Sequence, residues 1–247
     1  MMRSKFESIA KSVSKKVDNI APGYVFTYSD IIDDLDKAEA VIKALNRMVI
    51  SGKLKKISKG RFYIPEKSPF GELEPSEYQI AKDLLEKDNT PIGYLTGLSI
   101  YSKLGLTTQI GNIIQIGRNT ARPPLTRSKY KITFVLQKNS IKKENIPLLQ
   151  LLDVIKYFNK IPDSDTAFVI NRLKILISEI ADKQLKLFVD LLMKYPAKTR
   201  ALTGALLEDT GYHIFEDQIK STLNPITVYK LGLTKDVLPT GKNWNIK

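Results

Sequence analysis

The stretch SGKLKKISKGRFYIP, residues 51–65, contains five basic residues within nine positions and no acidic residue. Gly60 follows Lys59, and a glycine as the second residue of a two-residue turn supplies the positive φ that a tight hairpin needs. The stretch therefore predicts a basic β-hairpin with strands over 53–57 and 61–64, in which Ile57 lies opposite Phe62. Leu54 and Ile57 are an odd number of positions apart, which leaves open a bulge or a looser turn.

Three amphipathic segments precede the hairpin. Apolar residues at helical spacing predict a first helix over about residues 4–17, which the Pro22-Gly23 pair ends. Several N-cap candidates at 27–30 predict a short helix through Ile31, Ile32 and Leu35, and a third helix spans about 36–50 before Gly52. Helix, short helix, longer helix and hairpin is the order of a winged helix-turn-helix domain.

The charge of the chain suggests a polyanionic partner. The formal net charge is +13, and residues 1–67 hold 14 basic and 8 acidic residues, a net of +6. The polar face of the third helix and the hairpin carry residue types that contact phosphates and base edges in DNA. The candidate DNA-binding residues are Lys37, Lys43, Asn46, Arg47, Lys53, Lys55, Lys56, Lys59 and Arg61.

An alternative interpretation is a small helical domain with a solvated basic hairpin. Lysines on an exposed edge strand also protect against aggregation, so they do not require a nucleic-acid partner. Many domains of this topology bind proteins, and the fold alone does not decide the function.

The remainder of the chain predicts a second, larger domain. Three prolines in 65–75 are typical of a linker, and a small α/β part follows over about 75–140. From 146 to 247 the pattern is helical, with helices expected at 147–159, 163–180, 182–194 and 197–209 and a late strand at 226–229. The prediction is an α+β, mainly helical protein with domains at 1–67 and 68–247.

Few residues could support catalysis or metal binding. The chain has no cysteine and one histidine, His213, which excludes a cysteine nucleophile and a histidine-rich metal centre. Asp163 and Asp165 could hold magnesium, but beside Pro162 at a helix start we favour a capping role. No phosphate-binding loop or serine-hydrolase motif is present. We therefore expect a non-enzyme without cofactor or metal.

A second basic cluster surrounds Pro123-Pro124. One interpretation is a contact with nucleic acid or an acidic partner. A solvated loop is an equally justified interpretation. Its members are Arg118, Arg122, Arg127, Lys129 and Lys131.

The sequence also indicates the cellular compartment of the protein. No run of eighteen apolar residues occurs, and the basic start lacks the apolar core of a signal peptide. We therefore expect a cytoplasmic protein that does not span a membrane.

Four sequence blocks together resemble the AbiEi-like antitoxins of bacterial type IV toxin–antitoxin, or abortive-infection, systems. The resemblance covers about residues 5–160. The blocks are FTYSDI (26–31), NRMVISGKLKKISKGRFYIP (46–65), PFGELEPSEYQI (69–80) and GYLTGLSIYSKLGLTTQ (93–109).

The resemblance implies a two-part protein. Its N-terminal winged helix would bind the promoter of its own operon as a repressor, and its larger C-terminal region would counter a nucleotidyltransferase-like toxin without a stable complex. The DNA contacts that it implies are Lys43, Arg47, Lys55, Lys56, Lys59 and Arg61. The alternatives are a protein-interaction module or a general transcriptional regulator without toxin-neutralising activity.

Overall fold

The computed structural model describes residues 9–32 and 35–247. The chain divides into two compact units, which are residues 1–82 with 126–130 (unit 1) and residues 83–125 with 131–247 (unit 2). The units therefore separate at Lys82–Asp83, and not after residue 67. Neither unit is one continuous segment, because the chain passes between them three times.

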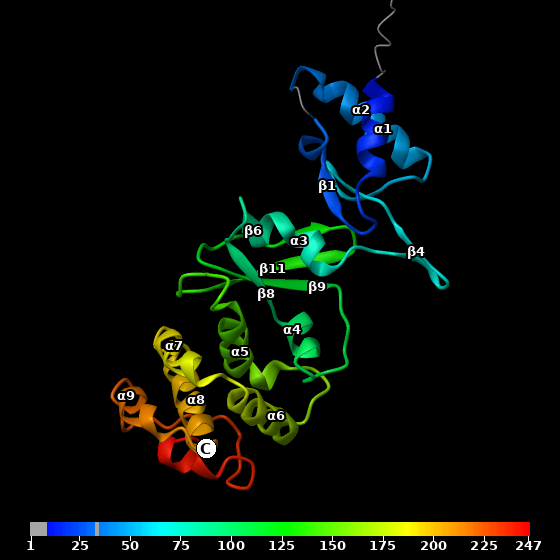
Figure 1. The fold of residues 1–247 in the computed structure, drawn as a ribbon. Helices are drawn as coiled ribbons and strands as arrows, with labels where there is room; N and C mark the ends of the chain where they lie inside the picture. The colour runs from blue at the N-terminus through cyan, green and yellow to red at the C-terminus, as the bar shows by residue number, and fades with distance from the viewer. Residues whose placement is uncertain (1–8, 33–34) are drawn as a thin grey trace, which may run out of the picture. The chain divides into compact units, whose positions relative to one another are not determined.

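Unit 1 combines two helices with a three-stranded antiparallel sheet (Figure 1). The sheet order is β1-β3-β2, so the strand that follows the turn lies in the centre. Val17, Leu45 and Phe62 are buried between the helices and the sheet. The elements are α1 (Ile9–Asp18), β1 (Val25–Thr27), the 3-10 turns η1 (Tyr28–Asp30) and η2 (Leu35–Lys37), α2 (Ala38–Ile50), β2 (Lys55–Ser58) and β3 (Arg61–Tyr63).

The basic hairpin is formed by β2 and β3, with Gly60 at a φ of 75° in its turn. Lys56 pairs with Phe62 and Ser58 pairs with Arg61, which leaves Ile57 in a bulge. The expected pairing of Ile57 with Phe62 is therefore wrong. The extra residue in the bulge shifts the alternation of sides, so Leu54 and Ile57 are both buried, at 1% and 3% exposure.

The helical expectations for unit 1 hold in part. The first helix is found from Ile9, and residues 4–8 of the prediction lie outside the described residues. The short helix expected through Ile31, Ile32 and Leu35 is not found among the described residues, which form 3-10 turns at 28–30 and 35–37, and residues 33–34 of the prediction lie outside the described residues. The longer helix is confirmed as α2, and Gly52 follows it with a φ of 79°.

Residues 66–73 form a second hairpin and not the expected linker. Strand β4 (Glu66–Ser68) pairs antiparallel with β5 (Gly71–Leu73). The Ser68 hydroxyl accepts a hydrogen bond from the Phe70 backbone N–H and donates one to the Gly71 carbonyl, so it closes the turn that contains Pro69. Proline here occupies a turn instead of breaking a strand. Helix α3 (Glu77–Leu85) follows this hairpin.

The four-stranded sheet has the order β10-β11-β9-β8, and its strands β8 and β9 lie wholly within unit 2. Strands β8 and β9 are antiparallel, whereas β9 and β11 are parallel, with Ile114 opposite Ile132. The elements of this part are β6 (Glu86–Lys87), β7 (Thr90–Pro91), β8 (Gly93–Thr96), α4 (Leu98–Lys103), β9 (Ile113–Arg118), β10 (Leu125–Arg127) and β11 (Tyr130–Leu136).

Helices make up most of the remainder of unit 2, and the four expected between 147 and 209 are confirmed within a few residues. Leu152, Leu173 and Phe188 lie in the core that these helices enclose. The strand expected at 226–229 is reduced to one bridge between Tyr229 and Ile246. The elements are α5 (Ile146–Lys156), η3 (Phe158–Lys160), α6 (Thr166–Ser178), α7 (Asp182–Leu192), α8 (Ala197–Asp209), η4 (His213–Phe215), α9 (Glu216–Lys220) and η5 (Pro239–Trp244).

The expected α+β class is confirmed by this mixture of helices and small sheets. Among the described residues, no helix has both the length and the apolar character to cross a lipid bilayer.

Candidate nucleic-acid interface

The basic residues of α2 differ in how freely they face solvent. Lys43 is exposed, and its Nζ lies 2.6 Å from Glu39 Oε1 one turn earlier. Arg47 is exposed, and no carboxylate of the described residues pairs with it. Asn46 is half-buried, and its Oδ1 is enclosed without a hydrogen-bond partner among the described residues. Lys37 is exposed but precedes α2, in η2.

Two lysines of the hairpin are held by neighbours within unit 1. The Lys53 ammonium lies 2.6 Å from Asp18 Oδ1 and donates to Ser14 Oγ at 3.1 Å, so it contacts α1. Lys55 forms an ion pair with Glu72 of the second hairpin, and this hydrogen bond is the main cause of its raised pKa. Each charge is therefore partly compensated within unit 1.

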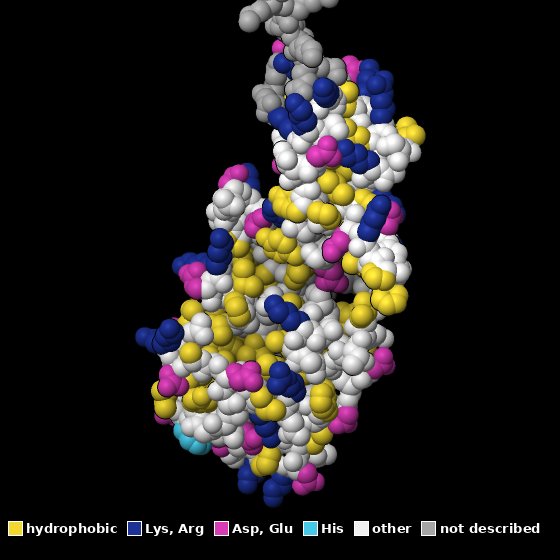
Figure 2. All heavy atoms as spheres, turned by 45° about the vertical axis from the view of Figure 1, so that its right-hand side comes forward, with side chains coloured by type: hydrophobic (Ala, Val, Ile, Leu, Met, Phe, Trp, Pro, Cys, Tyr) yellow, Lys and Arg dark blue, Asp and Glu magenta, His cyan; other side chains and the backbone are white. Residues whose placement is uncertain are grey.

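The tip of the hairpin carries the less restrained charges. Lys56 and Lys59 are exposed, and neither pairs with a carboxylate of the described residues. The Lys56 ammonium lies 5.6 Å from the centre of the Phe62 ring, and Arg61 is half-buried. In the view of Figure 2, Lys and Arg side chains lie on the surface of unit 1 with acidic side chains among them. Exposure and pairing thus single out Arg47, Lys56 and Lys59.

The second basic cluster is not one surface patch. Arg127 is buried, at 5% exposure, and its Nη1 donates to the Ile80 carbonyl at 2.6 Å, which is a structural role within unit 1. Lys129, also in unit 1, pairs with Glu74 at 2.9 Å. Arg118, Arg122 and Lys131 belong to unit 2.

The three unit 2 members have different surroundings. The Nε of Arg118 is buried without a hydrogen-bond partner, whereas Arg122 is exposed 5.7 Å from the Phe134 ring centre. Lys131 is exposed on β11. The five basic residues of this cluster therefore differ in burial and in their contacts.

The two aspartates considered for magnesium serve other contacts. Asp165 caps α6, since its Oδ2 accepts the Phe168 N–H at 3.0 Å, and the expected capping role is confirmed for it. Asp163 accepts a hydrogen bond from Gln109 Nε2 at 3.1 Å. Within the described ranges, no three His, Cys, Asp or Glu side chains come together as a metal site.

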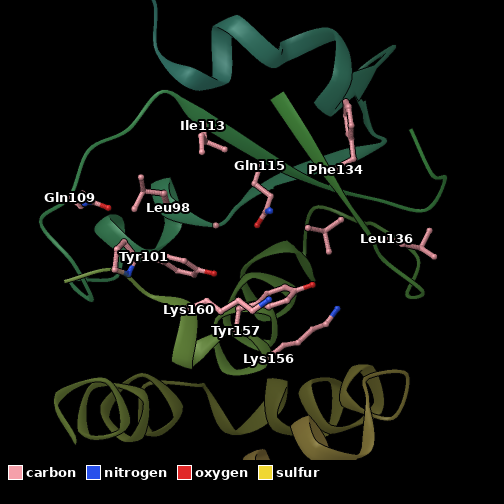
Figure 3. A pocket seen from close by; sticks show the side chains of 13 residues that line it. Leu98, Tyr101, Gln109, Ile113, Gln115, Phe134, Leu136, Lys156, Tyr157 and Lys160 are labelled. Carbon is pink, nitrogen blue, oxygen red and sulfur yellow. The ribbon is translucent and has the colours of Figure 1, made fainter. Parts of the chain in front are cut away.

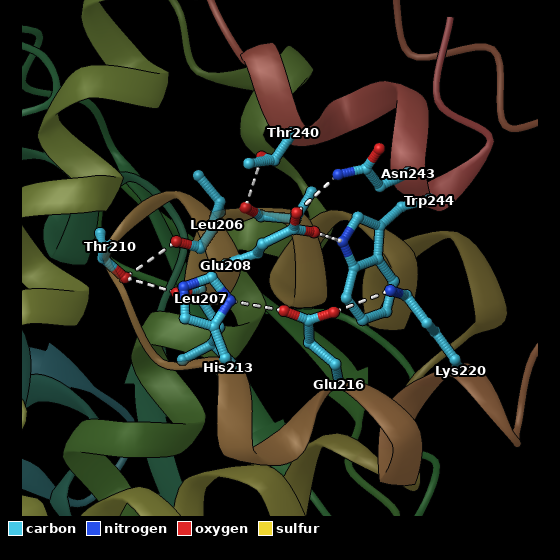
Figure 4. A network of polar contacts seen from close by, with 11 residues as sticks. Leu206, Leu207, Glu208, Thr210, His213, Glu216, Lys220, Thr240, Asn243 and Trp244 are labelled. Carbon is cyan, nitrogen blue, oxygen red and sulfur yellow. Dashed lines mark hydrogen bonds and ion pairs between the residues drawn. The ribbon is translucent and has the colours of Figure 1, made fainter.

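The single histidine belongs to a polar network at the C-terminal end of unit 2 (Figure 4). His213 Nδ1 and Lys220 Nζ both lie within 2.8 Å of the Glu216 carboxylate, and chiefly the Lys220 bond lowers the pKa of Glu216. Nearby, Glu208 accepts the Trp244 indole N–H at 2.7 Å. This arrangement fastens η5 to α8 and gives His213 a structural partner.

Sequence reasoning missed a buried polar cluster around Asp153 of α5. This carboxylate is 2% exposed and accepts hydrogen bonds from the hydroxyls of Tyr94, Thr96 and Tyr195 at 2.7 to 3.1 Å. Burial is the main cause of its raised pKa, and burial likewise raises the pKa values of both tyrosines. The available signal was an acid inside the apolar run LLQLLDVI, residues 148–155.

The chain belongs to DUF6088, a family of unknown function whose model matches residues 12–185. Its fold is similar to that of the RV2827C protein from Mycobacterium tuberculosis, whose crystal structure superposes with a TM-score of 0.59. The two chains are 15% identical, and the similarity covers 88% of this chain and 82% of that one. At this identity the likeness concerns the fold alone. No curated protein matches the sequence.

Proposed function

We propose that unit 1 is a winged helix-turn-helix domain that binds the promoter DNA of its own operon, and that the protein is an antitoxin and autorepressor. The order α1, β1, two turns, α2 and the β2–β3 hairpin supports the first part, together with the central position of β3. In this proposal α2 enters the major groove and the hairpin is the wing.

The observation that carries the proposal is the exposure of Arg47, Lys56 and Lys59 on α2 and on the hairpin that follows it. None pairs with a carboxylate of the described residues, so their charges are available to phosphates. Lysine and arginine contacts to phosphate release counterions and make binding salt-dependent. Arg47 can also reach a guanine edge from within the major groove.

Lys43 contributes less in this proposal, because a phosphate must compete with Glu39 for its ammonium. An exposed ion pair of this kind is weak, about 0.5 kcal/mol, so DNA can displace the glutamate. Lys53 and Lys55 act mainly within the protein.

An electrophoretic shift with the DNA upstream of the reading frame tests this part. The wild type is expected to give a shift that weakens as salt rises. The triple variant Arg47→Gln, Lys56→Gln and Lys59→Gln is expected to lose most of the affinity, and to lower the salt slope by about three. A control with the same charge change, at the exposed Lys183, Lys186 and Lys198 of unit 2, is expected to bind normally.

Equal shifts for the two triple variants would contradict the DNA-binding role. A partner that co-purifies with the chain while no DNA is bound at moderate salt would favour the protein-interaction module instead. DNA binding without protection from a toxin would favour a general transcriptional regulator.

The antitoxin role is supported by the resemblance of residues 5–160 and not by the geometry of unit 2. It predicts a nucleotidyltransferase-like reading frame beside this one. Expression of that neighbour alone is expected to arrest growth, and co-expression of this chain is expected to restore it. Growth arrest that persists with the wild-type chain present at high level would exclude the antitoxin role.

A further inference from the structure

Unit 2 contains an open pocket of about 710 Å³ between its sheet and the end of α5 (Figure 3). This volume lies in the range of small-molecule sites, about 300 to 1,000 Å³. In Figure 3, Gln115 of β9 points from the sheet toward Lys156, Tyr157 and Lys160, which come from the opposite wall. The pocket belongs to one unit and plays no part in the proposed DNA contacts.

One wall of the pocket is positively charged. Lys156 and Lys160 line it, and no aspartate or glutamate does. Neither lysine pairs with a carboxylate of the described residues, and the Lys156 and Lys160 ammonium groups lie 4.8 and 5.5 Å from the centre of the Tyr157 ring. A cation–π contact with a half-buried tyrosine ring contributes only about 1 kcal/mol. The two ammonium groups can therefore turn to an anion.

Two acidic side chains, Asp163 and Asp153, lie close to residues that line the pocket. Asp163 is occupied by the Gln109 amide at 3.1 Å. The charge of Lys156 helps to offset the effect of burial on Asp153, whose oxygens already accept hydroxyl hydrogen bonds. Because neither carboxylate forms an ion pair with the two lysines, the pocket keeps an excess of positive charge.

Much of the remaining lining of the pocket is apolar or aromatic, with Ile113, Phe134 and Tyr101 among its residues. Burial raises the pKa of Tyr101 to about 12, so its hydroxyl stays protonated at neutral pH and can donate. The Gln115 amide forms no hydrogen bond with the described residues and provides both a donor and an acceptor. Gly97 makes room for it, since a Cβ there would lie 2.8 Å from Gln115 Oε1.

We propose that this pocket binds a nucleoside phosphate. A flat base suits the apolar side, where it can stack on an aromatic ring, and Gln115 can bond the polar edge of the base. The phosphate is held by Lys156 and Lys160 through charge-assisted hydrogen bonds. A fatty acid would leave the amide unused, and an inorganic anion would leave the apolar side uncovered.

Calorimetric titration with the four nucleoside 5′-monophosphates tests the proposal, with the matching nucleosides and inorganic phosphate as further probes. At least one monophosphate is expected to bind with a Kd below about 1 mM. Its nucleoside and inorganic phosphate are each expected to bind at least about tenfold more weakly, because each makes only half of the contacts.

The double variant Lys156→Gln with Lys160→Gln is expected to weaken binding of the nucleotide at least about tenfold. Lys183→Gln with Lys186→Gln, on exposed positions of α7, makes the same charge change and is expected to leave binding unaltered. Lys160→Gln alone repeats the test without disturbing the surroundings of Asp153, and circular dichroism verifies folding. A 5′-phosphorylated trinucleotide tests whether the bound phosphate belongs to the end of a nucleic-acid strand. If the trinucleotide binds more tightly than the monophosphate, and the double variant abolishes this difference, the ligand is a strand end.

The proposal is overturned if none of the monophosphates binds, or if the two double variants bind the nucleotide equally. It is likewise overturned if inorganic phosphate binds as tightly as the nucleotide. These outcomes are independent of the promoter-binding assay, which depends on residues of unit 1.

Discussion

Lys53 lies with its ammonium 2.6 Å from the Asp18 carboxylate, so the start of the basic hairpin is joined to the end of α1. Lys59, six residues later, is exposed in the hairpin turn and pairs with no carboxylate of the described residues. Two lysines that look equivalent in the sequence therefore have different surroundings. The first has an internal partner, and the second can meet a phosphate.

Lys59→Gln and Lys53→Gln are expected to separate these roles. The Lys59 variant should weaken binding to promoter DNA and lower the salt slope of binding by about one, because one phosphate contact is lost. The Lys53 variant should leave the slope unchanged and lower stability by at most about 1 kcal/mol, as for a partly exposed ion pair. Fluorescence anisotropy over a salt series measures both. A larger loss for Lys53 than for Lys59 would reverse the assignment.

Glu72→Gln is expected to strengthen DNA binding. The substitution removes the acidic partner of Lys55 and leaves this lysine free to contact a phosphate. One added contact predicts a salt slope steeper by about one and a modest gain in affinity at low salt. The double variant Glu72→Gln with Lys55→Gln controls for the charge of Glu72 itself. If it keeps the full gain, Lys55 is not the cause.

Asp153→Asn is expected to destabilise the protein by about 2 kcal/mol, because one of the buried hydroxyls around it loses its acceptor. Denaturant unfolding measures the loss. Asp190→Asn, at an exposed position of α7, serves as the control and is expected to change little.

The effect of Asp153→Asn also depends on pH. The pKa of Asp153 is raised above its ordinary 3.8, so the folded protein holds this proton more tightly than the unfolded chain. The stabilisation that the folded protein gains from binding this proton is complete at a pH below that ordinary pKa, and it is lost as the pH rises through the folded-state pKa. Denaturant unfolding over a pH series should therefore show that Asp153→Asn lowers the free energy of unfolding most at acidic pH. A penalty that grows with pH would contradict the raised pKa.

Gly204→Ala is expected to destabilise unit 2 by about 1 to 3 kcal/mol, although alanine favours a helix more than glycine does. A Cβ at this position of α8 would lie 2.3 Å from the Trp244 ring. Displacing the ring also breaks the bond from its indole N–H to Glu208. Emission of this single tryptophan should shift to longer wavelength. In a Trp244→Ala background the same change should cost nothing, which a double-mutant cycle can verify.

Local patterns were enough to predict the long helices and the basic hairpin. Apolar spacing and prolines locate α5 to α8, and the glycine turn locates the hairpin. The bulge at Ile57 was open as an alternative because two buried positions were an odd distance apart. The prolines at 65, 69 and 75 predicted a linker, yet they flank or turn a hairpin, which depends on pairing that composition does not encode.

Long-range partners were beyond local reasoning. Nothing around Arg127 indicates that its guanidinium is buried against the Ile80 carbonyl, 47 residues earlier. The pairs Lys53–Asp18 and Lys55–Glu72 also join residues that are well separated in the sequence. The charge count therefore predicted a basic region correctly but could not tell which of its charges face solvent.

The segment 126–130 is packed with unit 1, although most of unit 2 surrounds it in the sequence. A ribosome releases the chain from its N-terminus, so the first 82 residues emerge well before Arg127 can reach Ile80. Unit 1 thus completes its contacts only after residue 130 has left the exit tunnel. Gene fragments that end near residue 82 would encode an unfinished domain, and recombination cannot transfer unit 1 as a single uninterrupted cassette.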